Sequence, residues 1–182
     1  MNAIEIMMEE HKNIEDLLNA LEIECLSLIN GSEVDDEYFR LVIDFIRNYA
    51  DSHHHKKEEI LLFNRMVDEI GTTAEKLVKY GMLVEHDLGR LYVSQLEDAL
   101  NRYKNGEKEA KLDIIGNSYS YMDLLKRHIF KENNVAYKYA ERELSSEILN
   151  LINEECIKFE EENRLVREKY INILNKLKNK NC

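Results

Sequence analysis

Proline is absent from this chain of 182 residues, and glycine occurs only 6 times. Proline breaks helices and glycine gathers at their ends, so the shortage of both predicts an almost entirely helical protein. Gly31, Gly71 and Gly106 each follow a stretch of helical periodicity and mark where helices stop. Ser145 and Ser146 offer caps for the start of a further helix. The chain is therefore predicted to form five helical segments.

Cysteine is also scarce, and its placement excludes two classes of small protein. The three cysteines, Cys25, Cys156 and Cys182, are widely spaced and form no Cys-x-x-Cys pair. An odd number at such spacing fits neither a disulfide framework nor a zinc site built from thiolates. Cys25 and Cys156 are expected to be small buried apolar residues, and Cys182 to belong to a frayed end.

Positive charge and long apolar runs are missing as well. The chain has 25 Lys and Arg residues against 36 Asp and Glu residues, a net charge of −11, without any basic cluster. Such a surface repels phosphate backbones and anionic lipid, so neither nucleic acid nor a membrane is an expected partner. No apolar run approaches the roughly 18 residues of a membrane span, and the N-terminus lacks the basic and apolar regions of a signal peptide. The expected location is cytoplasmic.

Every predicted helical segment contains a stripe of apolar residues. Apolar residues make up 44% of the chain, which is enough for one domain with a hydrophobic core. Spacings of three and four residues recur throughout, which is the pattern of bundled helices. The predicted fold is all-α, an up-down-up-down four-helix bundle over residues 1–143. Polar residues interrupt each of its four stripes: His11, then His54 and Glu58, then His86, then His128 and Glu132.

A fifth stripe runs from Leu149 to Leu177 and contains no histidine or carboxylate. Its regular heptads predict a long amphipathic helix within residues 144–182. This helix either packs on the bundle or pairs with a second copy to form a homodimer, and the heptads alone do not choose between the two.

The interrupting residues matter because they fall at one height. A single inward histidine is more often hydrogen-bonded than bound to metal. Antiparallel helices joined by short loops, however, bring positions equally far from a loop to the same level. His11 and His54 flank the first break at similar distances, and His86 and His128 flank the third within about two residues of each other at 1.5 Å rise apiece. The ligand-bearing positions are therefore predicted to converge.

The convergent residues have the chemistry of a paired metal site. One histidine comes from each of two helices and one His-x-x-x-Glu from each of the other two. Residues four apart share a helix face about 6 Å apart, so the imidazole can bind one ion while the carboxylate bridges to another about 3.5–4 Å away. A nitrogen and oxygen donor set without sulfur suits iron, while zinc and manganese stay open.

Three adjacent histidines raise a question of register. His53, His54 and His55 are about 100° apart on a helix, so they cannot all point inward. Counting back from His54 meets apolar residues, whereas counting back from His55 meets mostly polar ones. His54 with Glu58 is the prediction, and His55 with Glu59 is the alternative. The other histidines are expected to be solvated or to support the ligands from behind.

Four motifs in order resemble the hemerythrin-like, or HHE cation-binding, proteins over roughly the first 140 residues. They are Glu10-His11-Lys12-Asn13-Ile14, the stretch from His54 to Phe63, the stretch from Glu85 to Arg90, and His128-Ile129-Phe130-Lys131-Glu132. The resemblance implies a four-helix bundle with two non-haem iron ions bridged by oxo or hydroxo. The ligands that it implies are His11, His54, Glu58, His86, His128 and Glu132.

The chain departs from the classical oxygen carriers of that family at two positions. Arg90 stands where they have a fifth histidine, and Glu132 stands where they have an aspartate motif. Two imidazoles per iron would leave open positions, which favour chemistry over carriage. The resemblance therefore implies binding, sensing or reduction of O2, peroxide or NO, including oxidase, peroxidase or NO-scavenging activity. An iron store or donor for metal-centre repair and a metal-dependent interaction or sensor module are the alternatives.

Four further residues each have a structural and a functional interpretation. Tyr121 is either a core residue or a hydrogen-bond donor to a bound ligand. Gly89 either allows close helix packing or leaves a small pocket. Glu10 and Glu85 are either surface carboxylates or acceptors for imidazole N–H groups.

Overall fold

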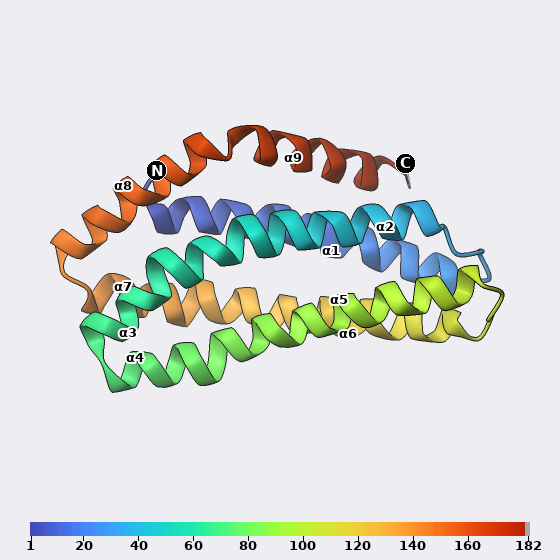
Figure 1. Ribbon diagram of the computed structural model, residues 1–182, viewed down its shortest axis with the longest axis horizontal. Helices are drawn as coiled ribbons and strands as arrows, with labels where there is room; N and C mark the ends of the chain where they lie inside the picture. The colour runs from blue at the N-terminus through green and yellow to red at the C-terminus, as the bar shows by residue number, and fades with distance from the viewer. Residues whose placement is uncertain (181–182) are drawn as a thin grey trace.

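The computed structural model describes residues 1–180, which form four antiparallel helical rods and two further helices (Figure 1). The rods are α1 (Ala3–Ile29); α2 (Asp36–Phe45), η1 (Ile46–His55), η2 (Glu58–Phe63) and α3 (Asn64–Ile70); α4 (Thr72–Leu77), η3 (Val78–Met82) and α5 (Leu83–Lys104); and α6 (Ala110–Lys131), η4 (Glu132–Ala136) and α7 (Tyr137–Glu143). Residues 1–180 contain no strand. The prediction of an all-α up-down-up-down bundle is confirmed.

The rods end where the glycines predicted. Gly31, Gly71 and Gly106 have φ angles of 102°, 82° and 102°, the backbone conformation that glycine adopts most readily just after a helix. Asn2 caps the first rod by accepting a hydrogen bond from the Glu5 N–H at 2.8 Å. These ends fix the lengths of the rods and therefore which residues meet across the bundle.

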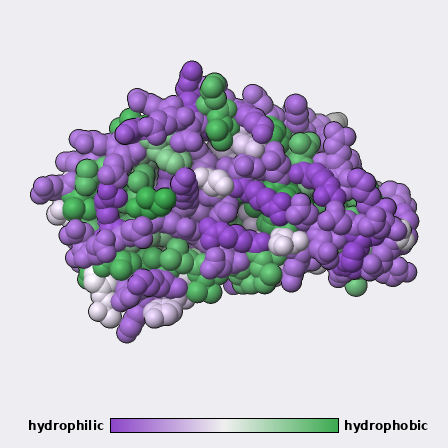
Figure 2. All heavy atoms as spheres, viewed as in Figure 1, coloured by the Kyte–Doolittle hydropathy of each residue, from purple (hydrophilic) through white to green (hydrophobic). Residues whose placement is uncertain are grey.

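The core consists of two apolar clusters with a polar layer between them. The larger cluster includes Ile14, Phe45, Leu96 and Leu125. The smaller cluster lies toward the other end of the bundle and includes Met7. Cys25 and Cys156 are buried in these clusters as predicted, at 5% and 0% exposure. The apolar stripes thus face inward, and Figure 2 shows a largely hydrophilic outer face with hydrophobic side chains along its lower edge, over α4 and the beginning of α5.

Three of the π-helical segments contain residues that were predicted as metal ligands. η1 contains the three adjacent histidines, η2 begins at Glu58 and η4 begins at Glu132. In a π-helix the backbone bonds run from residue i to i+5, so each residue advances less around the axis than in an α-helix. Faces predicted from a regular α-helical period therefore shift by about one residue after each such turn.

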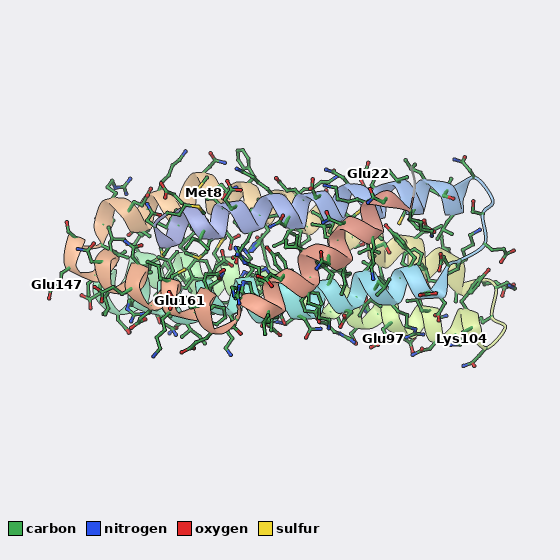
Figure 3. The ribbon with its side chains drawn as sticks, turned by 90° about the horizontal axis from the view of Figure 1, so that it is seen from above. Met8, Glu22, Glu97, Lys104, Glu147 and Glu161 are labelled. Atoms are coloured by element: carbon green, nitrogen blue, oxygen red, sulfur yellow. The ribbon has the colours of Figure 1, made fainter. Side chains whose placement is uncertain are left out.

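The C-terminal segment is two helices, α8 (Ser146–Glu162) and α9 (Arg164–Asn179), which meet at Asn163. Both lie along α1, and α9 also contacts α2. Seen from above, α9 crosses the bundle obliquely towards α1 (Figure 3). Packing on the bundle is thus one role of this segment, and pairing with a second copy stays a prediction. Cys182 lies outside the described residues.

Within residues 1–180, the structure has no helix whose length and apolar content would suffice to span a membrane.

Replacing Leu174 with alanine should destabilise the protein strongly. Leu174 is 2% exposed and packs in the larger cluster, and removing such a side chain typically costs about 2–5 kcal/mol. Leu165→Ala is the matched control, because Leu165 lies on the same helix at 72% exposure. Urea unfolding measures both. A Leu174→Ala variant as stable as Leu165→Ala would show that α9 does not contribute to the core.

Candidate metal centre

All six residues predicted as ligands lie in the polar layer between the two apolar clusters. They come from every rod: α1, η1 and η2, α5, and α6 with η4. Each is buried, with exposures from 0% to 2%. The residues are His11, His54, Glu58, His86, His128 and Glu132.

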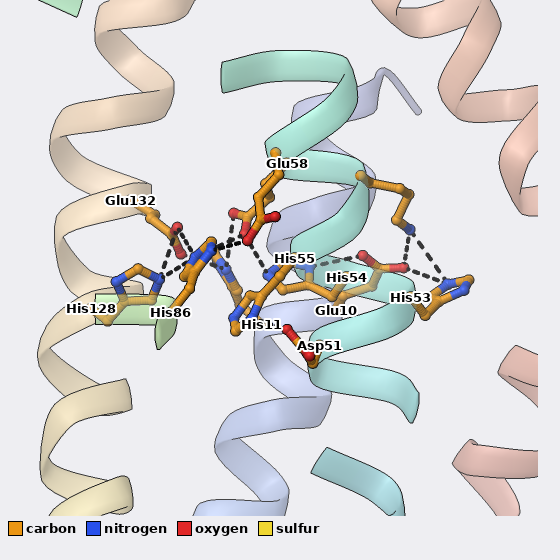
Figure 4. Close-up of polar contacts among 12 residues, drawn as sticks. Glu10, His11, Asp51, His53, His54, His55, Glu58, His86, His128 and Glu132 are labelled. Atoms are coloured by element: carbon orange, nitrogen blue, oxygen red, sulfur yellow. Dashed lines mark hydrogen bonds and ion pairs between the residues drawn. The ribbon is translucent and has the colours of Figure 1, made fainter. Parts of the chain in front are cut away.

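The ligand atoms form two groups that share the carboxylates between them (Figure 4). In the first group, atoms of His11, His54 and both glutamates lie within 4.8 Å of one another. The second group is formed by the ring nitrogens of His86 and His128, with His55 beside them. Glu132 Oε1 lies 3.0 Å from His128 Nε2 in this group. Glu58 Oε2 lies 3.6 Å from His54 Nε2. It also lies 3.7 Å from His86 Nε2. The two carboxylates are therefore placed between the two pairs of histidines.

Each of the four predicted ligand histidines is held from behind through its outer nitrogen. The Nδ1 atoms of these rings face acceptors at hydrogen-bond distance, which leaves the Nε2 atoms directed toward the carboxylates. The pairs are His11 with Asn133 Oδ1 at 2.8 Å, His54 with Glu10 Oε2 at 3.0 Å, His86 with Glu59 Oε1 at 2.7 Å, and His128 with Glu85 Oε2 at 2.9 Å.

Glu10 and Glu85 thus act as acceptors for imidazole groups rather than as plain surface carboxylates. Asn133 and Glu59 do the same, a role that was not predicted from the sequence. A signal was present in the sequence, because Asn133 directly follows Glu132 and Glu59 directly follows Glu58.

Four of the inward-facing atoms lack a hydrogen-bond partner, which is the property expected of a cation site. Among the described residues, His54 Nε2, Glu58 Oε2 and both carboxylate oxygens of Glu132 are buried without a hydrogen bond. Burial and then the negative charge of Glu132 raise the pKa of Glu58 well above its usual range. Because burying an unpaired carboxylate is costly, a bound cation would stabilise this arrangement. The nitrogen and oxygen donor set fits iron and contains no thiolate.

The three adjacent histidines are more deeply buried than the sequence predicted. His53, His54 and His55 are all buried, at 2%, 0% and 6% exposure, so His53 and His55 are not solvated. His53 Nε2 lies 3.0 Å from Glu10, the acceptor for His54, and so fits the other expectation, that it supports a ligand from behind. The physical reason for the burial is that all three lie in the π-helical η1, which turns less per residue than an α-helix.

The ring of His55 lies beside the second group of histidines. It stacks on the ring of His86 with centroids 3.9 Å apart and planes at 9°, and a ligand atom of His55 lies within 4.8 Å of ligand atoms of His86 and His128. The lone pair of an imidazole lies in the plane of its ring, and these two planes are nearly parallel and separated, so no single point lies in both. In this orientation His55 and His86 therefore cannot both bind one ion.

Tyr137 is a further residue of the site that was not predicted from the sequence. Its hydroxyl donates a hydrogen bond to Glu58 Oε1, and its ring stacks on that of His11 with centroids 5.6 Å apart. Burial and then the charge of Glu58 raise the pKa of Tyr137 well above its usual range, so it stays a neutral donor. A regular α-helical period would place Val135 on the inner face after Glu132, but Val135 is 50% exposed, because the π-helical η4 shifts the buried face to Tyr137.

A buried network joins the site to the C-terminal segment. Glu10, which holds His54, also contacts Lys57 Nζ and lies 3.0 Å from His53 Nε2. Glu160 on α8 contacts the same lysine and lies 3.2 Å from His53 Nε2. Burial would raise the pKa of Glu10, but His53, His54 and Lys57 outweigh it and hold that pKa well below its usual range. Glu10 is therefore a charged anchor for the His54 ring.

Arg90 lies outside the polar layer, at the position where a fifth histidine was missing from the motif. Its guanidinium pairs with Asp51 at 2.7 Å, with Asp87 at 2.8 Å and with Glu59 at 2.9 Å. It thereby helps to position Glu59, the acceptor for His86 Nδ1.

Comparison with known proteins agrees with this geometry. The chain matches the hemerythrin HHE cation binding domain over residues 2–140, from the start of the bundle into α7. Neither the curated proteins nor the solved structures compared with it gave a match. The matched range contains all six predicted ligand positions and excludes α8 and α9. The chain therefore belongs to the hemerythrin HHE cation-binding family.

Proposed function

We propose that this protein is a non-haem di-iron protein that binds, senses or reduces a small oxidant, O2, peroxide or NO, at a carboxylate-bridged site. The proposal depends on one observation: His54 Nε2, Glu58 Oε2 and both oxygens of Glu132 are buried without a hydrogen bond, while the outer nitrogens of all four histidines are held in place. The proposed ligands are His11, His54, Glu58, His86, His128 and Glu132.

A pair of iron ions would supply redox equivalents and Lewis acidity to a bound oxidant. The residues around the site supply its orientation and its dryness. Tyr137 donates a hydrogen bond to Glu58 and so orients that carboxylate. The two apolar clusters flank the polar layer toward either end of the bundle and limit the access of bulk water from those directions.

We expect His55→Ala to keep two bound ions per chain. The rings of His55 and His86 are nearly parallel with centroids 3.9 Å apart, so one ion cannot lie in the planes of both rings, and we expect the removal of His55 to cost no ligand. His86→Ala is the matched comparison and should lose at least one ion. Metal analysis by mass spectrometry measures both variants. Loss of one ion from His55→Ala would instead identify His55 as a third imidazole ligand beside His86 and His128.

Stepwise exposure to oxidants tests the function. The iron-loaded protein should have the visible and resonance Raman spectra of a bridged diferric centre. After anaerobic reduction, separate additions of O2, hydrogen peroxide and NO should each be followed by spectrum and by consumption of the oxidant. Response to at least one of them supports the proposal. Inertness to all three, together with transfer of iron to an apo acceptor, would replace it with an iron donor.

A further inference from the structure

A cavity opens beside the second group of histidines, on the side away from His11 and His54. It has a volume of about 400 Å³ and lies between η1, α5 and α6. Its lining runs from the exposed Arg47 and Arg90 to the buried His86 and His128. Ligand pockets for small organic molecules typically occupy about 300–1,000 Å³, whereas one water in the liquid occupies roughly 30 Å³. The cavity is therefore much larger than a diatomic oxidant requires.

The inner wall of the cavity is mostly apolar. Ile46, Val93 and Leu125 contribute aliphatic side chains, and Gly89 contributes only backbone. A Cβ at Gly89 would lie 3.6 Å from the side chains of Leu125 and Tyr121, an ordinary van der Waals distance. The backbone at Gly89 thus tolerates a side chain, and a large one there would occupy the space of the cavity.

One polar group in this wall has no partner. Tyr121 lines the cavity and is 3% exposed, and its hydroxyl makes no hydrogen bond within residues 1–180. Buried hydroxyls are normally hydrogen-bonded, so an unpaired one inside a cavity indicates a missing partner. Burial, and then the charge of Asp51, raise the pKa of Tyr121, so the group is a neutral phenol. The missing partner is therefore a group that accepts or donates a hydrogen bond.

The charges at the mouth are already neutralised by neighbours. Arg90 pairs with Asp51 at 2.7 Å, and Arg47 pairs with Glu97 at 2.7 Å. Glu85 contacts both Lys131 and His128 Nδ1. A charged ligand would have to displace these paired groups at the mouth and would lose its hydration on entry. This arrangement selects for a neutral molecule.

We infer that this cavity binds a compact neutral organic molecule, mostly apolar, with one oxygen-containing group that hydrogen-bonds to the hydroxyl of Tyr121. Bound in this way, the molecule lies against His55, His86 and His128. A reaction of the bound molecule would rest on the proposed function, because the metal pair would supply the chemistry. Binding of the molecule does not rest on it, because binding depends only on the residues that line the cavity.

Benzyl alcohol is a suitable probe, with toluene and benzoate as comparisons. All three rings fit a cavity of this size, but only benzyl alcohol combines neutrality with a hydroxyl. Ligand-detected NMR titration of the full-length, metal-loaded protein should give saturable binding of benzyl alcohol, weaker binding of toluene and none of benzoate. Tyr121→Phe should weaken benzyl alcohol about three- to tenfold, the effect of one hydrogen bond, and leave toluene unchanged.

Two variants control the experiment. Tyr119→Phe should not change binding, because Tyr119 is on the same helix at 66% exposure. Gly89→Leu should abolish binding of both neutral probes while keeping the helical circular dichroism of the parent. Absence of saturable binding, or binding that survives Gly89→Leu, would overturn the inference. Equal affinities of parent and Tyr121→Phe for benzyl alcohol would also overturn it.

Iron content measured on the same samples separates the two proposals. Iron-loaded protein that binds no neutral probe contradicts the cavity inference alone. Protein that binds benzyl alcohol through Tyr121 but holds no iron contradicts the proposed function alone.

Discussion

Glu58→Gln is expected to abolish binding of the second metal ion while leaving the metal-free protein nearly as stable as the parent. The pKa of Glu58 is raised well above its usual range, by burial and then by Glu132, so the site favours the neutral carboxyl in the absence of metal. Glutamine has almost the shape of that protonated group, and it can still accept the hydrogen bond from Tyr137. It lacks the negative charge that a bridging ligand needs.

Two measurements separate these effects. Urea unfolding of metal-free protein should differ by less than about 1 kcal/mol between parent and variant, the scale of one hydrogen bond. Metal analysis after reconstitution should show two ions in the parent and at most one in Glu58→Gln. Glu9→Gln is the control, because Glu9 lies at the surface with a side chain that is 55% exposed. Two tightly held ions in Glu58→Gln would remove Glu58 from the ligand set.

Lys57→Met is expected to have the largest effect on stability. Lys57 is 1% exposed, and its ammonium contacts Glu10 and Glu160. Removing it would leave two carboxylates without their shared cation, and breaking a buried pair in this way typically costs about 3–5 kcal/mol. That is a large part of the 5–15 kcal/mol that stabilises a typical domain.

The same variant should also weaken metal binding, because Glu10 anchors the ring of His54. Loss of such a supporting contact typically lowers metal affinity about 10- to 100-fold. Lys56→Met is the matched control, since the neighbouring Lys56 is exposed. Urea unfolding and competition with a metal chelator measure the two effects. A Lys57→Met variant that behaves like Lys56→Met in both would show that the network does not support the site.

The level at which the polar residues meet could be predicted because glycine fixes the ends of the rods. Gly31, Gly71 and Gly106 stand where the structure turns, so counting from them brought His11, His86 and the other positions to one height. This inference needed only the rise of a helix and short loops. Metal binding by these residues stays a prediction.

The residues that were missed share one physical cause. His55 and Tyr137 lie within or just after π-helical turns, where a count based on the α-helical period assigns the wrong face. The burial of Lys57 was also not foreseen, because it depends on contact with Glu160 on α8, which is 103 residues further along the chain. Local periodicity contains no information about such a contact.

Anomalous diffraction from crystals of the iron-loaded protein tests the central claim most directly. Two peaks at the iron edge, about 3.5–4 Å apart, are predicted between the histidine groups, with Glu58 and Glu132 within coordination distance of both. A single peak, or peaks only at the separate cluster of Glu10, His53 and Glu160, would contradict a carboxylate-bridged metal pair.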